Sequence, residues 1–394
     1  MAPVDFFCQG PVMAAHPVLG GLAFLSLGLL FWQWILGRRL SLRGPVADVS
    51  FQPTVSILKP VKGVDAEMRA CFESWLRQDY PGDVEVLFGV ERGDTEAIEL
   101  IRTLEGPRAR LVVIDRLTGT NAKVAKLAVL AAEAANEIVV TSDADTFVPP
   151  DFLRQLVQPL RDRPVGLVNS YYSLTKMRNA AMWWEAIGIN ADFWAQVRQS
   201  NSLKPMDFAL GAVMGMRREV LAAIGGFGSL VDHLADDYEL GGLVARHGWR
   251  IELVPQVAEC REAEFGWRRA WAHQLRWART IRVCRPGSYF ASILNNTTLW
   301  LLLWLAASGP AVGCVVGAGL LLRLLVAANL MRLLTGDCRH VPWLWLVWVK
   351  DLLGVLVWAG AFLGNTVQWR GEAFRILPGG RLERLTMPPA LIPD

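Results

Sequence analysis

The chain has 394 residues, of which 53% are hydrophobic and 20% are charged, and its formal net charge at pH 7 is +3. A mean hydropathy of +0.29 is too high for an ordinary soluble enzyme, whereas this many charged residues exclude a pure bundle of membrane helices. The length suggests about two domains, the small net charge predicts no nucleic-acid partner, and no two cysteines have the CxxC spacing of a zinc site.

The first predicted element is a membrane helix. Residues 17–37 form an uncharged apolar run that is long enough to cross the ~30 Å hydrocarbon core of a bilayer. Arg38, Arg39 and Arg43 follow this run and no lysine or arginine precedes it, so we expect residues 1–16 outside and the next domain in the cytosol. A signal peptide would need a basic region before the run and a small-residue cleavage site after it.

Strands and helices are then predicted to alternate within a domain that covers residues 44–264. The spacing of apolar residues predicts strands over 54–58, 84–90, 110–115, 138–141 and 211–217, and helices over 68–78, 95–104 and 121–135. Such alternation implies parallel strand pairing, and it therefore predicts a doubly wound α/β domain. Neither a GxGxxG nor a Walker sequence is present, so dinucleotide and P-loop sites are not supported.

Two aspartates, Asp143 and Asp145, directly follow the predicted strand over 138–141. The carboxyl end of a buried strand is where ligands gather in open α/β sheets. Carboxylate oxygens suit hard divalent cations such as Mg²⁺ or Mn²⁺, which in turn bridge to phosphates. The pattern predicts a site for a metal ion and a diphosphate, and an ordinary acidic loop is the alternative for so short a motif.

Other polar residues are expected near the same edge of the sheet. Glu91 and Asp94 follow the second strand, and Lys123 lies at the start of the helix after the third strand, where backbone amides can meet phosphate oxygens. Asp236 and Asp237 follow a glycine turn. Taken alone, Asp94 is a common turn residue, Lys123 a solvated helix residue, and the Asp236–Asp237 pair a helix cap.

Residues 265–290 are predicted to form amphipathic helices at the membrane surface. They contain His273, Arg276 and Trp277 on a sequence with helical spacing. A tryptophan here also suits packing at the interface, where this residue is enriched.

Apolar sequence resumes over 297–363 and predicts two or three membrane segments. If Gly309 and Pro310 only kink a single span over 299–331, the tail of residues 364–394 returns to the cytosol; if they separate two spans, the tail lies outside. The positive-inside rule favours the first arrangement, because the tail contains Arg370, Arg375, Arg381 and Arg384.

The last apolar stretch, about residues 341–363, carries two adjacent charges, Lys350 and Asp351. Charged residues at membrane depth are costly and usually face a partner. The alternative is that both residues lie near the membrane surface.

The order of these motifs resembles that of inverting, membrane-bound glycosyltransferases with the GT-A fold. The similarity is greatest to the ceramide glucosyltransferase family, including bacterial relatives that glycosylate hopanoids. It covers nearly the whole chain and rests on Asp94, Asp143-Ala-Asp145, Asp237, Arg276-Trp277 and the tail sequence Trp369-Arg-Gly-Glu-Ala-Phe. It implies an integral membrane enzyme, in a bacterial inner membrane, with a cytosolic GT-A domain.

The resemblance also implies roles for individual residues. Asp237 would be the catalytic base, while Asp143 and Asp145 would hold the donor and a Mg²⁺ or Mn²⁺ ion, with Asp145 as the more direct metal ligand. Glu91 or Asp94 would contact the nucleoside, because Arg92 stands where the family usually has an aspartate.

The remaining implied contacts go to the donor diphosphate. They involve Lys123, Arg276 and Trp277, together with His273, which occupies the position of the family's usual glutamine or arginine.

The function expected from this resemblance is transfer of one sugar from a UDP-sugar to a membrane lipid hydroxyl with inversion. UDP-glucose and a ceramide-like sphingolipid are the first expectation, and UDP-N-acetylglucosamine with a hopanoid polyol is the alternative. A processive polysaccharide synthase, a non-catalytic membrane protein that binds nucleotide sugars, and a metal phosphoesterase are further alternatives.

Overall fold

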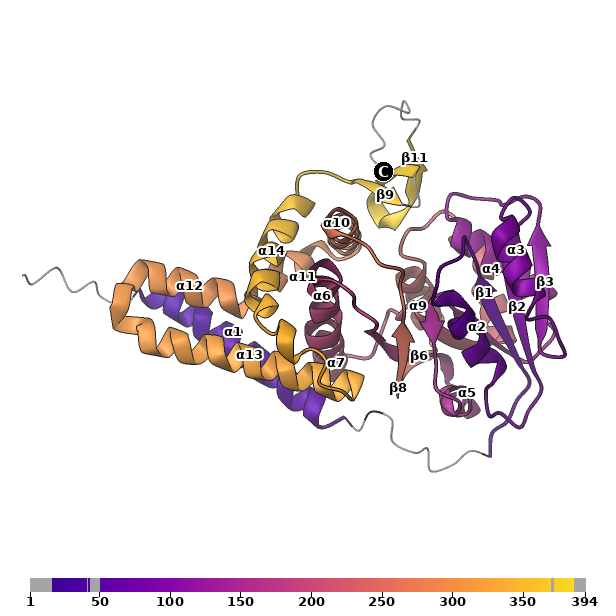
Figure 1. The fold of residues 1–394 in the computed structure, drawn as a ribbon, viewed down its shortest axis with the longest axis horizontal. Coiled ribbons are helices and arrows are strands. Elements are labelled where there is room, and N and C mark those ends of the chain that lie inside the picture. Colours follow the sequence, from indigo (N-terminus) through magenta and orange to yellow (C-terminus); the bar gives the residue numbers. More distant parts are fainter. Residues whose placement is uncertain (1–15, 41, 43–49, 370–371, 386–394) are drawn as a thin grey trace, which may run out of the picture.

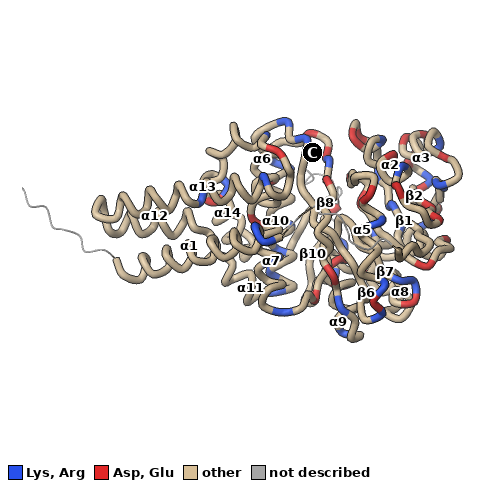
Figure 2. The backbone as a smooth tube through the Cα atoms, turned by 90° about the horizontal axis from the view of Figure 1, so that it is seen from below, with Lys and Arg blue, Asp and Glu red and all other residues tan. Residues whose placement is uncertain are grey.

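The computed structural model describes residues 16–40, 42, 50–369 and 372–385. It contains an α/β domain that carries most of the charged residues, and long helices that extend from one side of this domain (Figures 1 and 2). Residues 1–15, Arg43 and Arg370, for which membrane topology was predicted, lie outside the described residues.

The α/β domain is built on an eight-stranded sheet with the order β3-β2-β1-β4-β7-β6-β8-β5. Strand β1 pairs in parallel with β2 and β4, and β2 pairs in parallel with β3. Strand β7 is antiparallel to both β4 and β6, which makes the sheet mixed beyond the first four strands. The strands are β1 Val55–Pro60, β2 Val84–Glu91, β3 Ala109–Ile114, β4 Ile138–Ser142, β5 Thr146–Phe147, β6 Val165–Leu174, β7 Val213–Arg217 and β8 Arg250–Cys260.

Helices cover both faces of this sheet, so the predicted doubly wound architecture is confirmed. Side chains alternate along β1, where Ile57 belongs to the core on one face and Leu58 to the core on the other. Strands buried on both faces need apolar residues at nearly every position, which explains the continuous apolar runs in the sequence. The first core is covered by α2 (Met68–Leu76), α3 (Thr95–Arg102) and α5 (Phe152–Leu156), and the second by α4 (Ala122–Glu133), α8 (Arg218–Ala223) and α9 (Asp236–Arg246).

A middle layer of helices lies between the sheet and the projecting helices (Figure 1). It is formed by α6 (Ala180–Ile187), a π-helical turn (Gly188–Phe193), α7 (Trp194–Leu203), α10 (Trp267–Cys284) and α11 (Pro286–Ala291). Helices α10 and α11 fill the range predicted as amphipathic helices. Trp267, Ile281 and Phe290 are exposed on them, each with at least 47% of its surface accessible.

The projecting helices are α1 (Pro17–Arg38), α12 (Thr297–Ser308) and α13 (Gly313–Thr335), and α14 (Leu346–Ala361) lies nearer the domain (Figure 1). Helix α12 packs against both α1 and α13. Gly309 has a φ of +66° and Pro310 begins a short 3-10 turn, so the chain reverses here. The preference for one kinked helix over 299–331 is therefore wrong, because a left-handed glycine turns the segment into a helical hairpin.

Two stretches of the described chain, Pro17–Arg38 and Thr297–Thr335, are long and apolar enough to cross a membrane. Large apolar side chains on these helices face outward, including Phe24 and Leu325, each 57% exposed. Their surface carries few charged residues, in contrast to the α/β domain (Figure 2).

The adjacent charges in the last apolar stretch do face partners. The guanidinium group of Arg323 in α13 donates to both carboxylate oxygens of Asp351 in α14, at 2.9 and 2.8 Å, and to Asp192 at 3.0 Å. Lys350 also pairs with Asp351 and Asp192. Because Asp192 belongs to the π-helical turn, this buried cluster joins the projecting helices to the middle layer.

The tail contains a second, three-stranded antiparallel sheet, which the sequence did not predict. It consists of β9 (Thr366–Trp369), β10 (Glu372–Ile376) and β11 (Leu382–Arg384). This sheet lies beside α10, on the same side of the molecule as the α/β domain (Figure 1).

Candidate functional site

Lys123 connects two of the predicted acidic motifs. Its ammonium group lies 2.7 Å from the carboxylate of Asp143 and 3.5 Å from that of Asp236. Burial disfavours the charged ammonium, but the carboxylates of Asp143 and Asp236 outweigh this effect and raise the pKa of Lys123. The side chain is only 13% exposed, so Lys123 lies inside the site and is not a solvated helix residue.

Local structure explains the position of Lys123. Asn121 caps α4, and its side-chain oxygen accepts hydrogen bonds from the backbone amides of Lys123 and Val124 at 3.1 and 3.2 Å. Gly119 has a φ of +89°, and a Cβ atom there would lie 2.5 Å from Cβ of Val231. Only glycine therefore allows the start of α4 to lie against the segment that precedes Asp236.

Asp237, the predicted base, is in the first turn of α9 and close to the Asp143 strand end. One carboxylate oxygen accepts the amide hydrogen of Tyr238 at 2.8 Å. The other faces Gly211, where a Cβ atom would lie only 2.9 Å away. The next carbonyl, that of Ala212, accepts the amide hydrogen of Asp143 at 3.2 Å. Asp237 and Asp143 thus both contact the backbone of residues 211–212. The absence of a side chain at Gly211 leaves room for the Asp237 carboxylate.

The surroundings of Asp237 favour the protonated form of its carboxyl group. Burial, followed by repulsion from Asp236, raises the pKa of Asp237 to about 6. Lys123 acts in the opposite direction. A carboxylate with a pKa in this range is suited to accept a proton from a substrate hydroxyl.

Asp145 lies in the most acidic part of the site. Burial and the negative charges of Asp143 and Glu262 raise the pKa of Asp145 to about 7. A divalent cation would relieve this repulsion, so the donor set fits a metal ion. Among the described residues no group of three or more His, Cys, Asp or Glu side chains is arranged to hold a metal. The protein would therefore supply one or two carboxylates and leave the other positions to water and phosphate oxygens, as is usual for Mg²⁺.

Lys59 is a site residue that the sequence analysis missed. It is fully buried at the end of β1, and its ammonium group donates to the hydroxyl of Ser142 at 3.0 Å and to the carbonyl of Asp143 at 2.8 Å. Burial lowers the pKa of Lys59 to about 8, although Asp145 and Asp143 favour its charged form. The sequence signal for this role was a lysine at the end of an otherwise apolar strand. Neighbouring parallel strands such as β1 and β4 end at the same edge of the sheet, so this lysine lies close to Asp143.

The first acidic motif is held close to the start of α4. Glu91 lies 2.9 Å from the ammonium group of Lys126, which is one helical turn beyond Lys123. Asp94 caps α3 and accepts the amide hydrogen of Gly63 at 2.6 Å, as expected of a turn residue. Arg92 pairs with an aspartate at the surface. The donor contacts of Glu91 and Asp94 stay predictions.

His273, Arg276 and Trp277 lie at the periphery of the acidic cluster. The Nδ1 atom of His273 is 2.5 Å from a carboxylate oxygen of Glu185, and its ring packs edge-on against Trp277. Burial and the charge of Glu185 raise the pKa of Glu262, and His273 and Arg276 act in the opposite direction. The negative charge of Glu262 in turn contributes to the raised pKa of Asp145. Glu262 therefore links the charges of the α10 motif to Asp145.

Glu185 is a second residue that the sequence analysis missed. It is 1% exposed in α6, and neither of its oxygens accepts a hydrogen bond of regular geometry from the described residues. A lone acidic residue within the apolar sequence of α6 was the available signal, since buried carboxylates need a partner.

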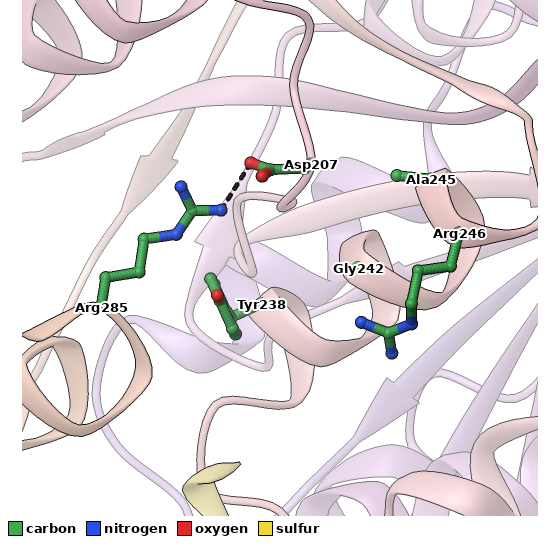
Figure 3. A pocket seen from close by; sticks show the side chains of 6 residues that line it. All are labelled: Asp207, Tyr238, Gly242, Ala245, Arg246 and Arg285. Carbon is green, nitrogen blue, oxygen red and sulfur yellow. Dashed lines mark hydrogen bonds and ion pairs between the residues drawn. The ribbon is translucent and has the colours of Figure 1, made fainter.

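A small pocket of about 280 Å³ opens beside α9 and is lined by Tyr238, the residue after Asp237 (Figure 3). Arg285 projects into it, donates to Asp207 at 2.5 Å and lies over the ring of Tyr238. This volume is below the usual size of sites for drug-sized ligands. The lining residues are Asp207, Tyr238, Gly242, Ala245, Arg246 and Arg285.

Comparison with known sequences gives one family match over most of the chain. The model described as glycosyl transferase family 21 matches residues 19–382. Ceramide glucosyltransferase 3 of Caenorhabditis elegans is 23% identical over 351 residues, which cover 86% of this chain and 76% of that protein. An N-acetylglucosaminyltransferase of Mesorhizobium japonicum is 22% identical over 340 residues, covering 82% and 76% of the two chains.

Solved structures with a similar fold include a mannosyltransferase of Pyrobaculum calidifontis in complex with GDP-Man and Mn²⁺. It is 21% identical, has a TM-score of 0.48, and the match covers 86% of this chain and 98% of that chain. Glucosyl-3-phosphoglycerate synthase of Mycobacterium tuberculosis, in complex with Mn²⁺ and UDP-glucose, is 20% identical with a TM-score of 0.40, over 62% of this chain and 86% of that chain.

Proposed function

Since the chain belongs to glycosyl transferase family 21, we propose that it transfers one sugar from a UDP-sugar to a hydroxyl group of a membrane lipid with inversion. The doubly wound domain with flanking helices agrees with the GT-A architecture that the resemblance implied. Transfer of glucose and transfer of N-acetylglucosamine are equally supported, because a ceramide glucosyltransferase and an N-acetylglucosaminyltransferase match at similar identity. We propose a ceramide-like acceptor for the first reaction and a hopanoid polyol for the second.

The observation that carries this proposal is the meeting of Lys123, Asp143 and Asp236 in one ion-pair cluster beside Asp237. A sugar transferase needs a base for the acceptor and positive charge for the leaving diphosphate. Both kinds of group converge at this edge of the sheet, from segments more than 90 residues apart.

In the proposed reaction Asp237 acts as the base. A lipid hydroxyl is a poor nucleophile, so its proton passes to the Asp237 carboxylate as its oxygen bonds to the anomeric carbon. The bond from that carbon to the diphosphate oxygen breaks at the same time, and UDP leaves on the opposite face. A single displacement of this kind inverts the anomeric configuration.

Charge builds up on the diphosphate as it leaves. Asp143 and Asp145 would hold a divalent Mg²⁺ or Mn²⁺ ion, which when bound neutralises negative charge on phosphate oxygens. Lys123 would add a fixed positive charge at the same position. We assign Glu91 and Asp94 to the nucleoside, and His273, Arg276 and Trp277 to the outer side of the donor site.

The lipid acceptor is supported by the apolar helices, which project from the helical layer that packs beside the α/β domain. With α1, α12 and α13 in the bilayer, the hairpin of α12 and α13 returns the chain to the side of the α/β domain. Because α14 lies nearer the domain and does not project with α12 and α13, the described part of the tail, residues 364–369 and 372–385, then lies on the cytosolic side together with the active site. A headgroup hydroxyl can reach an active site at the membrane surface while the acyl chains stay in the lipid.

The test is a reaction with purified, reconstituted protein. UDP-glucose, UDP-galactose and UDP-N-acetylglucosamine would each be combined with ceramide, diacylglycerol or bacteriohopanetetrol, and the products read by mass spectrometry. A monoglycosylated lipid that disappears with Asp237→Asn is the expected result. Long polymer without added lipid would support a polysaccharide synthase, free sugar phosphate a phosphoesterase, and UDP-sugar binding without any product a non-catalytic protein.

A further inference from the structure

The small C-terminal sheet is bonded to the segment that leads into the proposed base. The amide of Leu382 donates to the carbonyl of Asp232 at 2.7 Å, and the amide of Leu234 donates to the carbonyl of Gly380 at 3.1 Å. His233 and Arg381 form a β-bridge between these two bonds. Backbone pairing therefore joins residues 232–234 to a part of the chain that is almost 150 residues away in sequence.

Apolar packing accompanies this backbone pairing. Leu234 is 6% exposed and belongs to one hydrophobic cluster with the sheet residues Val367, Phe374, Ile376 and Leu382. Phe374 and Ile376 are at most 2% exposed. The loop side chain is thus part of the core of the small sheet, and the two cannot separate without exposing this core to water.

The opposite side of the same segment holds the start of α4. The carboxylate of Asp232 accepts the amide hydrogen of Thr120 at 3.0 Å, and the side-chain amide of Asn121 donates to the carbonyl of His233 at 2.8 Å. Asn121 is the residue that caps α4 ahead of Lys123. Residues 232–234 therefore lie between the C-terminal sheet and the helix whose lysine contacts Asp143 and Asp236.

Helix α10 anchors the sheet from the membrane-proximal side. Arg279 donates to the carbonyl of Thr366, and Arg282 donates to the carbonyl of Gly364 at 3.2 Å. The guanidinium group of Arg276 lies 6.0 Å from the centre of the Trp369 ring. The sheet thus connects α10, which carries the Arg-Trp motif, to the loop that precedes the acids.

We propose that residues 366–369 and 372–384, the described part of the small sheet, form a positioning element of the active site. They hold residues 232–234 against α4, and this fixes where the following Asp236 and Asp237 point. The inference rests on the proposed role of Asp237 as the base. Catalytic groups must be held within about 0.5 Å of the productive geometry, and a loop bonded on both sides meets this requirement better than a loop exposed on one side.

Phe374→Ala in the full chain tests this proposal, with Arg375→Ala as the matched control. Phe374 lies in the shared core, whereas Arg375 is exposed and pairs with Glu383 at the surface. Rates are divided by the number of UDP-binding sites from calorimetry, so that an unfolded fraction does not count as a slow enzyme. We expect kcat per site to fall at least tenfold in Phe374→Ala, while the KM for the UDP-sugar changes less than twofold. In Arg375→Ala the kcat per site should change less than twofold.

A wild-type kcat per site in Phe374→Ala would overturn the positioning role. A parallel loss of UDP binding and rate would indicate general unfolding, and Ile376→Val then decides: a wild-type kcat per site in that variant would also overturn the role. Ile376→Val, which removes a single methyl group from the same core, covers the case in which Phe374→Ala does not fold, and it should show a smaller fall of the same kind. If the wild-type protein itself forms no glycolipid, the proposed function fails, and this outcome is distinct from both results above.

Discussion

The ammonium group of Lys123 lies 2.7 Å from the carboxylate of Asp143, and the lysine side chain is only 13% exposed. Asp236 is the third member of this cluster, at 3.5 Å from the same ammonium group. The lysine is thus placed between the motif assigned to the metal and donor and the motif that carries the base.

Replacing Lys123 by Met should lower kcat/KM about 100-fold or more, because it removes a preorganised positive charge from a buried site. The loss is measured with saturating lipid acceptor and varied UDP-sugar. Lys204→Met is the matched control, since Lys204 is about half exposed and pairs only with Asp207. Nearly wild-type kcat/KM in Lys123→Met would remove the lysine from the mechanism.

The rate should depend on pH through Asp237. Burial and the Asp236 charge raise the pKa of Asp237 to about 6, and a protonated carboxyl group cannot accept the substrate proton. We expect kcat/KM to rise as pH increases through about 6 and then to level off. Asp236→Asn removes a neighbouring negative charge, so it should move this midpoint to lower pH. A profile that is flat between pH 5 and 8 would contradict the assignment.

Asp145→Asn should separate activity from stability. Burial and like charges raise the pKa of Asp145 to about 7, so the ionised form that predominates at pH 8 is disfavoured in the folded protein. In the absence of metal, the variant should therefore be at least as heat-stable as the wild type at pH 8, yet lose about 100-fold or more in kcat.

Addition of Mg²⁺ or Mn²⁺ should raise the Tm of the wild type and have little effect on Asp145→Asn, because a ligand that binds only the folded state stabilises it. Chelation of the metal should abolish activity in the wild type. An equal metal-induced shift of Tm in the two proteins would show that Asp145 does not bind the ion.

The contact between Glu185 and His273 should be visible in a double-mutant cycle. Glu185 is 1% exposed and lies 2.5 Å from the His273 ring, so each side chain restrains the other. His273→Gln introduces the residue usual in the family and should retain activity. Glu185→Gln should lower activity more in the His273 protein than in the His273→Gln protein, with a coupling of about 1 kcal/mol or more.

Glu264→Gln serves as the control for this cycle, since Glu264 is exposed and bonds only to Asn179. If the effects of Glu185→Gln and His273→Gln were additive within error, the contact would have no bearing on activity.

Asp351→Ala should strongly destabilise the protein. Asp351 is buried between Arg323 and Lys350, and its removal leaves buried cations without their counter-charge. Breaking such a cluster costs about 3–5 kcal/mol. The Tm in detergent measures this loss. Asp337→Ala, in the loop after α13, is the control, because Asp337 pairs with Arg339 at the surface. A Tm equal to that of the wild type would show that the cluster does not join the helices to the domain.

The sequence by itself determined the elements and the position of the acids along them. Apolar periodicity predicted the strands from β1 to β4 and the helices between them, since a strand buried on both faces needs apolar residues throughout. The end of a buried strand likewise placed Asp143 and Asp145 at one edge of the sheet. Five motifs in order were sufficient to identify the family over most of the chain.

Only the tertiary structure decided which distant residues meet. Lys59 reaches the Asp143 strand end because β1 and β4 are neighbours, and strand order depends on packing and not on local propensity. Gly309 reverses the chain between two apolar helices, and the small sheet of the tail shares its core with Leu234 of the loop that precedes the base. Contacts of this kind depend on how separate segments pack, and no short window of sequence contains both partners.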